Sequence, residues 1–94
     1  MFTVKIDKTT YGFSFVHEIF EYATGVQRIT HCLVSINEIS SPVYSGHAFC
    51  NPGDQFVKSY GRKISLARAL KLLGLNREDR TAVWNEYFRT HKKI

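Results

Sequence analysis

The stretch that decides the fold runs from Gly46 to Leu70 and reads GHAFCNPGDQFVKSYGRKISLARAL. Its first part, through Cys50, looks like a strand that ends in the Asn-Pro-Gly-Asp turn at 51–54. The remainder passes into a helix that carries Arg62 and Arg68. A turn that feeds a helix start offers free backbone N–H groups, and arginines on the same element add positive charge. This corner therefore suits a phosphate-bearing ligand.

Upstream of this stretch the residue pattern predicts more strands. Residues 2–7 alternate apolar and polar side chains, which indicates a short strand. Residues 13–22 and 26–36 are rich in aromatic and branched side chains, and a fourth strand is expected over 43–50. Residues 17–22 also fit a helix. The short spacers between these segments favour an antiparallel meander.

Two helices are expected after the strands. Asp54 is the expected N-cap of the first and Gly74 its end, while Asn76 is expected to cap a last helix that runs to about Thr90. One arc of the first helix is expected to cover the sheet: Phe56, Tyr60, Ile64, Ala67 and Leu70. The apolar side of the last helix carries Val83, Trp84, Tyr87 and Phe88. The prediction is a single α+β domain over 1–94, a four-stranded antiparallel meander followed by two helices packed on one face.

Composition points to an anionic partner. The 94-residue chain has a formal net charge of +5 and a pI near 9.4, which favours a nucleic acid, a nucleotide or an acidic protein surface. Aromatic residues make up 14% of the chain, which suggests stacking sites or an interface between copies. Neither a signal peptide nor an apolar run of about 18 residues is evident. We therefore expect a cytoplasmic protein, no membrane segment and reduced thiols.

Arg68 is the strongest candidate for a ligand contact. It lies in line with Gly61, two turns earlier on the predicted helix. Glycine inside a helix costs about 1 kcal/mol relative to alanine, and its missing side chain leaves room for a ligand or another subunit. The alternatives are that Arg68 is solvated and covers the edge of the core, and that Gly61 ends a short helix. Arg62 shares an outward face with Lys58 and Ser65, so it is the weaker candidate.

Turn chemistry alone explains residues 51–54. Asn51 would end the strand, proline fixes φ, glycine permits a positive φ and Asp54 caps the helix. If Asp54 is the cap, it also occupies the N–H groups that would hold a phosphate. The ligand would then be held by Asn51 and the arginines. Arg28 lies within a strand and needs a partner if its face is buried, or else it lies at the strand end in water.

Metal binding and catalysis are both disfavoured. His31, Cys32, His47 and Cys50 match zinc ligands by type, but His31 and Cys32 are neighbours in a strand and point to opposite faces, as do His47 and Cys50. The same alternation argues against a Cys50–His47 nucleophile pair, while His17 or His31 remains open as a partner. No serine triad signature, paired carboxylates or phosphate-binding loop motif is present. We expect no metal, no cofactor and no enzyme activity.

Part of the chain resembles a known family. The run Gly46-x-Ala48-x-Cys50-Asn51-Pro52-x-Asp54-x-Phe56, followed by GRKISLARA at 61–69, resembles small bacteriophage proteins, and most nearly the first family of Thoeris anti-defence proteins. The resemblance spans about 25 of the 94 residues. It implies a phage protein that sequesters a cyclic ADP-ribose isomer or a cyclic oligonucleotide, without cleaving it, in the cytoplasm of an infected bacterium. It also implies a homo-oligomer with ligand at the subunit interface.

The resemblance also suggests which residues bind the ligand. Asn51 and Arg68 match best, as a base-or-ribose contact and a phosphate contact. The other candidates are Arg28, His31 and Tyr44, which would line the same pocket from the sheet, together with Asp54 and Arg62. The chain departs from the family at Leu72, where a second arginine one turn beyond Arg68 would be expected.

Two other functions fit the same sequence. A small basic phage protein could bind nucleic acid, with a steep dependence of affinity on salt. It could also inhibit a host enzyme by surface contact, with Trp84, Tyr87 and Phe88 as anchors.

Overall fold

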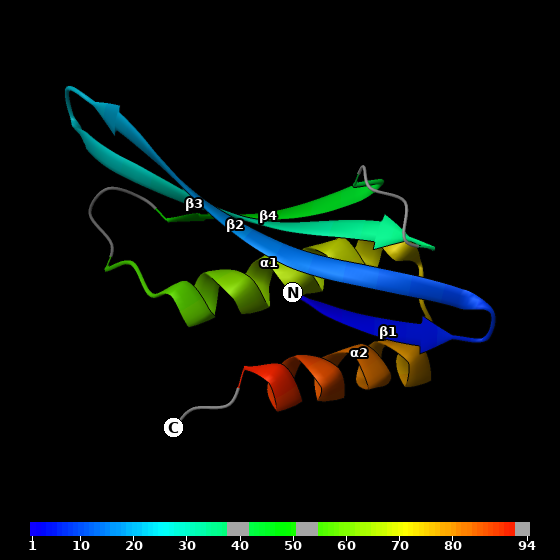
Figure 1. Cartoon of the computed structure of the whole chain (residues 1–94). Coiled ribbons are helices and arrows are strands. Elements are labelled where there is room, and N and C mark those ends of the chain that lie inside the picture. The colour runs from blue at the N-terminus through cyan, green and yellow to red at the C-terminus, as the bar shows by residue number, and fades with distance from the viewer. Residues whose placement is uncertain (38–41, 51–54, 92–94) are drawn as a thin grey trace.

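Four strands are followed by two helices in the computed structural model, which describes residues 1–37, 42–50 and 55–91. The strands are β1 (Phe2–Ile6), β2 (Thr9–Tyr22), β3 (Gly25–Ile36) and β4 (Tyr44–Cys50), and the helices are α1 (Lys58–Leu73) and α2 (Arg77–Thr90). Both helices lie on the same side of the sheet (Figure 1). The predicted α+β meander is therefore confirmed. Residues 17–22 belong to β2, so the helical alternative for that segment is wrong.

The sheet has the order β1-β2-β3-β4, and each strand pairs antiparallel with its neighbour in the sequence. Because side chains alternate along a strand, the register assigns each residue to one of two faces. The helix-side face carries a row across the strands in which Phe2 is opposite Phe13 and Phe13 is opposite Val34. The other face, which we call the outer face, is covered by neither helix (Figure 1). Its central residues are Val16, Glu18, Phe20, Ile29, His31, Leu33, Ser45, His47 and Phe49.

Helix α1 packs on β3 and β4 through small residues. A Cβ on Gly61 would overlap the hydroxyl of Thr30, and a Cβ on Gly46 would overlap the carbonyl oxygen of Ser65 and lie 2.5 Å from the backbone nitrogen of Ala69. The close approach expected at Gly61 is thus made by the chain's own strand β3. Gly61 lies within α1, so it does not end a shorter helix.

The buried face of α1 differs from the predicted one. Its buried residues are Gly61, Ser65, Leu66, Ala69 and Leu70. Tyr60 and Ala67, both expected to cover the sheet, are exposed, with 67% of the Tyr60 surface accessible. The predicted arc was wrong because it was drawn through the large apolar residues. The helix backbone packs directly on the sheet, and only small residues fit at that contact.

Helix α2 packs on β1 and begins as the sequence predicts. The Asn76 side chain accepts a hydrogen bond of 2.8 Å from the Asp79 N–H, and Gly74 ends α1 with φ of 66°. Val83 and Tyr87 are buried in the core, while half of the Phe88 surface is exposed. No helix in the described part of the chain has the length and apolar character needed to cross a bilayer.

The β2–β3 hairpin extends beyond the rest of the sheet. Pairing with β1 reaches only Phe13, and pairing with β4 reaches only Arg28. Residues 20–22 of β2 and 25–27 of β3 therefore form a two-stranded ribbon that projects past the start of α1 (Figure 1). Its exposed apolar side chains are Phe20, Tyr22 and Val26, and the exposed Ile19 lies at its base. The base of the hairpin lies beside the beginning of α1.

Candidate functional site

The N-terminus of α1 lies beside the base of the projecting hairpin. The helix begins at Lys58, and its N-cap is Val57, which makes no side-chain cap hydrogen bond. The prediction that Asp54 caps this helix is therefore wrong, although Asp54 itself lies outside the described residues. No acidic residue occupies the first turn. Within the described residues, no carboxylate of the first turn or of the cap offsets the partial positive charge of this helix start.

Cationic and aromatic side chains converge at this helix start. Arg28, on the helix-side face of β3, places its guanidinium carbon 5.3 Å from the centre of the Phe56 ring. His17, on the same face of β2, has its ring centre 5.8 Å from that of Phe56, in an edge-on arrangement. Among the described residues, the partner that the sequence requires for a half-buried Arg28 is the aromatic face of Phe56.

The pKa of His17 reflects the positive charges around this corner. Its Nδ1 lies 2.9 Å from Oγ1 of Thr30, a buried hydroxyl on the adjacent strand. Desolvation by burial lowers the pKa of the His17 imidazole, and the positive charges of Lys58 and Arg62 lower it further. Neutral His17 is therefore favoured at pH 7, in an environment that disfavours added positive charge.

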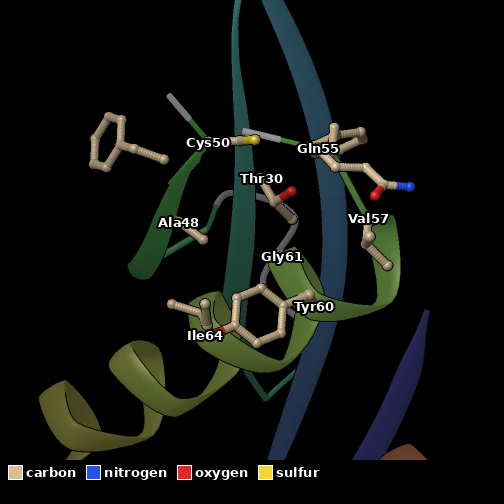
Figure 2. Close-up of a pocket in the computed structure, with 10 residues that line it drawn as sticks. Thr30, Ala48, Cys50, Gln55, Val57, Tyr60, Gly61 and Ile64 are labelled. Atoms are coloured by element: carbon tan, nitrogen blue, oxygen red, sulfur yellow. The ribbon is translucent and has the colours of Figure 1, made fainter. Parts of the chain in front are cut away.

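Two hollows meet at Phe56. The first, of about 480 Å³, carries the charged side chains, and its walls are His17, Glu18, Ile19, Arg28, Phe56 and Lys58. The second, of about 200 Å³, is mostly apolar and lies between β4 and α1 (Figure 2). Ala48 and Cys50 line it from the strand, Tyr60 and Ile64 from the helix, and Thr30 lies between them. A charged chamber thus adjoins an apolar one with a shared aromatic wall.

The structure brings only some of the predicted site residues together. Arg28 lines the charged hollow, and Arg62 lies close enough to affect His17 while its Nε donates to the Tyr87 hydroxyl at 3.4 Å. Arg68 is ten residues beyond Lys58, about 15 Å along the helix. Its Nη1 donates to the backbone oxygen of His47 at 2.6 Å. Arg68 therefore contacts β4 rather than the α1 N-terminus.

His31 and Tyr44 do not share a pocket with Arg28 within one chain. His31 lies on the outer face, opposite His47. Tyr44 is opposite Val34, six residues along β4 from the position that faces Arg28, or about 20 Å away. Asn51 and Asp54 lie outside the described residues, so the predicted contact from Asn51 stays a prediction.

Sequence reasoning missed three residues of this corner: His17, Lys58 and Phe56. A signal for His17 was present, because it continues the inward alternation of Phe13 and Phe15 along β2. The sequence pattern places Phe56 on the arc that covers the sheet. It places Lys58 on the outward face of the helix, where a solvated side chain is expected. Their convergence depends on where α1 starts, which the turn sequence did not indicate.

The cysteines and histidines separate as the alternation predicts. Cys32 is fully buried on the helix side, where burial raises the pKa of its thiol to about 12. Cys50 lines the apolar hollow, whereas His31 and His47 face outward. Among the residues that the structure describes, no three His, Cys, Asp or Glu side chains are grouped to hold a metal ion.

No protein-family model, curated protein or solved structure matches this chain. The function is therefore argued from the geometry of the site, because a fold of this simplicity hosts many activities.

Proposed function

We propose that this protein binds and sequesters a cyclic nucleotide signal, a cyclic ADP-ribose isomer or a cyclic oligonucleotide, and leaves it chemically unchanged. The observation that carries the proposal is the pair of adjoining hollows at the start of α1. One holds the cations Arg28 and Lys58 beside a single carboxylate, and the other is lined mostly by apolar and aromatic side chains. A nucleotide has the same division between a phosphate and a flat base.

The phosphate would lie in the charged hollow. Arg28 and Lys58 approach it from β3 and from the first residue of α1, and the helix dipole adds to their attraction. Charge-assisted hydrogen bonds of this kind contribute about 1.5–3 kcal/mol each. Glu18, the acidic residue of the hollow, belongs to the outer face of β2, with its carboxylate 2.5 Å from His31 Nε2.

The base would lie in the apolar hollow. Phe56 forms the wall shared with the phosphate side, and Tyr60 offers an exposed ring on α1. Stacking on an aromatic side chain contributes about 1–3 kcal/mol per base. Gln55 and Thr30 supply amide and hydroxyl groups that can read the edge of a base.

The biological setting of the proposal comes from the sequence resemblance. A phage protein of this kind would act in the cytoplasm of the infected bacterium and lower the free concentration of an immune signal by mass action. Self-association is part of the proposal. The tip of the β2–β3 hairpin supports it, since it exposes apolar side chains such as Phe20 and Tyr22, the latter with 56% of its surface accessible.

Binding is tested by isothermal titration calorimetry and thermal shift against cyclic ADP-ribose isomers and cyclic di- and trinucleotides. Arg28→Ala and Lys58→Ala are each expected to weaken binding by about tenfold or more. Lys63→Ala is the matched control, because it removes one charge from an exposed position of α1 whose ammonium faces Phe88. Its affinity should stay within about twofold of the wild type. Arg68→Ala tests the phosphate contact predicted from the resemblance.

Different outcomes separate the possible functions. If no cyclic nucleotide shifts the melting temperature, the sequestration proposal fails. If DNA or RNA binds instead, with log affinity falling steeply against log salt, the cationic corner is a nucleic-acid surface. If a cyclic nucleotide binds equally well to the Arg28→Ala, Lys58→Ala and Lys63→Ala variants, the function survives but the site lies elsewhere. Mass spectrometry of the recovered ligand tests whether it is unchanged.

A further inference from the structure

Four polar side chains form a chain of contacts across the outer face, and one of them, Glu18, also lines the charged hollow. Ser45 Oγ lies 3.2 Å from Nε2 of His47, and Nδ1 of His47 lies 2.6 Å from Nδ1 of His31. At the far end Glu18 Oε1 lies 2.5 Å from Nε2 of His31, an ion-pair distance without good hydrogen-bond geometry. The series therefore runs from hydroxyl to imidazole to imidazole to carboxylate over three strands.

One set of tautomers fits the two hydrogen bonds of this series, those between Ser45 and His47 and between His47 and His31. The Ser45 hydroxyl donates to Nε2 of His47, whose Nδ1–H donates to Nδ1 of His31. The remaining proton of His31 then lies on Nε2, facing the Glu18 carboxylate. A general base must accept a proton on one nitrogen while its other nitrogen is held by an acceptor, and His47 meets both conditions.

The serine also opens into a hollow at the edge of the sheet. Ser45, Gly46, His47, Phe49, Arg68, Lys71 and Leu72 line it, at about 540 Å³. Arg68 and Lys71 bring two positive charges from α1, while Phe49 and Leu72 are apolar and largely exposed. Nucleophile, base and cations thus line one accessible cavity, which is the arrangement expected of a reaction site.

We propose that Ser45 is a nucleophile activated by His47, and that this site carries out acyl transfer from small activated esters that bear a negative charge. His31 and Glu18 are positioning residues that hold His47 in the required tautomer. Arg68 and Lys71 attract the anionic group of the ester. The nucleophile and the nucleotide hollows lie on opposite faces of the sheet, because His31 and its neighbour Thr30 point to opposite faces. Glu18 is common to the two sites, since it lines the charged hollow and contacts His31.

The chemical step balances without any co-reactant besides water. Ser45 Oγ forms a bond to the ester carbonyl carbon while its proton moves to Nε2 of His47. The bond from that carbon to the leaving oxygen then breaks, and the leaving group departs with the electron pair and takes the proton from His47. Water, deprotonated by His47, attacks the acyl-serine and releases the acid, and the proton returns to Ser45.

The test uses the full chain and two probes. A fluorophosphonate is followed by intact-mass and peptide mass spectrometry, and the mono-4-nitrophenyl ester of succinic acid is followed by absorbance. Modification of Ser45 and slow ester turnover are expected, and both should be lost in Ser45→Ala. Ser14→Ala is the matched control, since Ser14 lies on the same face opposite Leu33. This variant should behave as the wild type.

Further variants separate activation from simple exposure of the serine. His47→Gln is expected to slow labelling by about 100-fold, the lower bound for a lost general base. His31→Gln should lower kcat for the ester without changing KM, because it touches no substrate. Lys71→Ala should remove the preference for the succinate ester over neutral 4-nitrophenyl acetate. Circular dichroism confirms that each variant is folded.

The proposal is overturned if Ser45 is labelled no faster than Ser14, or if labelling persists at the wild-type rate in folded His47→Gln. Loss of ester turnover in Ser45→Ala, with nucleotide binding unchanged, would show that the two activities are independent. Turnover that disappears in Arg28→Ala would contradict the assignment to the outer face.

Discussion

Replacing Gly46 by alanine tests how α1 is held on the sheet. The new Cβ would overlap the carbonyl oxygen of Ser65 and lie 2.5 Å from the nitrogen of Ala69. Both are backbone atoms of the helix, so no side chain can rotate away to relieve the overlap. Because Cβ atoms rarely come closer than 3.0 Å to such atoms, α1 has to move outward by about 1 Å.

The size of that displacement determines how much unfolding free energy is lost. A gap of 0.5–1 Å removes about a quarter to a half of the attraction between packed atoms, and Leu66 and Leu70 are fully buried against the sheet. Overpacking usually costs about 1–3 kcal/mol, and we expect about 3 kcal/mol here because the obstacle is backbone. For a domain of this size the melting temperature should fall by roughly 12–24 °C.

The assay is urea unfolding followed by circular dichroism, with Gly61→Ala as the comparison. At Gly61 the obstacle is the Thr30 side chain, so adding Thr30→Ala should restore part of the stability lost in Gly61→Ala. Thr30→Ala should not rescue Gly46→Ala. A loss below about 1 kcal/mol in Gly46→Ala, or an equal rescue of both variants, would refute the proposed packing.

Three further predictions follow from contacts already described. Asn76→Ala removes the hydrogen bond that the Asn76 side chain accepts from the Asp79 N–H, and it should lower the unfolding free energy by about 1 kcal/mol in the same urea assay. No change would mean that water replaces this hydrogen bond at no cost. The pKa of His17 is lowered in the folded state, so the unfolded chain takes up a proton first. Stability should be complete above pH 6.5 and fall as the pH drops from there through the folded pKa, and His17→Gln should abolish this component of the urea–pH profile. Arg68→Ala frees the carbonyl of His47 on the edge strand and should increase self-association in sedimentation velocity, whereas an unchanged sedimentation coefficient would show that Arg68 does not protect this edge.

Local sequence signals were sufficient for the elements themselves. Alternation in β1, short spacers between strands, Gly74 at a positive φ and Asn76 as a cap each act within a few residues. These features depend on steric and hydrogen-bonding rules that hold in any surrounding fold. The order of strands followed because a meander pairs neighbours in the sequence.

The candidate site was less predictable because it depends on contacts between distant segments. Arg28 was named from the sequence, but its partner Phe56 lies on the segment before α1. The contact between His31 and His47 requires the exact register of β3 against β4, which alternation alone does not supply. The face of α1 was misassigned since Gly61 and Ser65 carry no hydrophobic signal, although they make its closest approach to the sheet.

The packing of α2 under β1 has a consequence for synthesis of the chain. β1 leaves the ribosome early, but the ring of Tyr87 that packs edge-on against Phe2 arrives only with the last helix. Until then the apolar underside of the β1–β2 hairpin stays open to water and to other nascent chains. Folding of this half is therefore delayed until translation has passed residue 87, and stalled fragments that end before α2 should be substrates for chaperones and proteases.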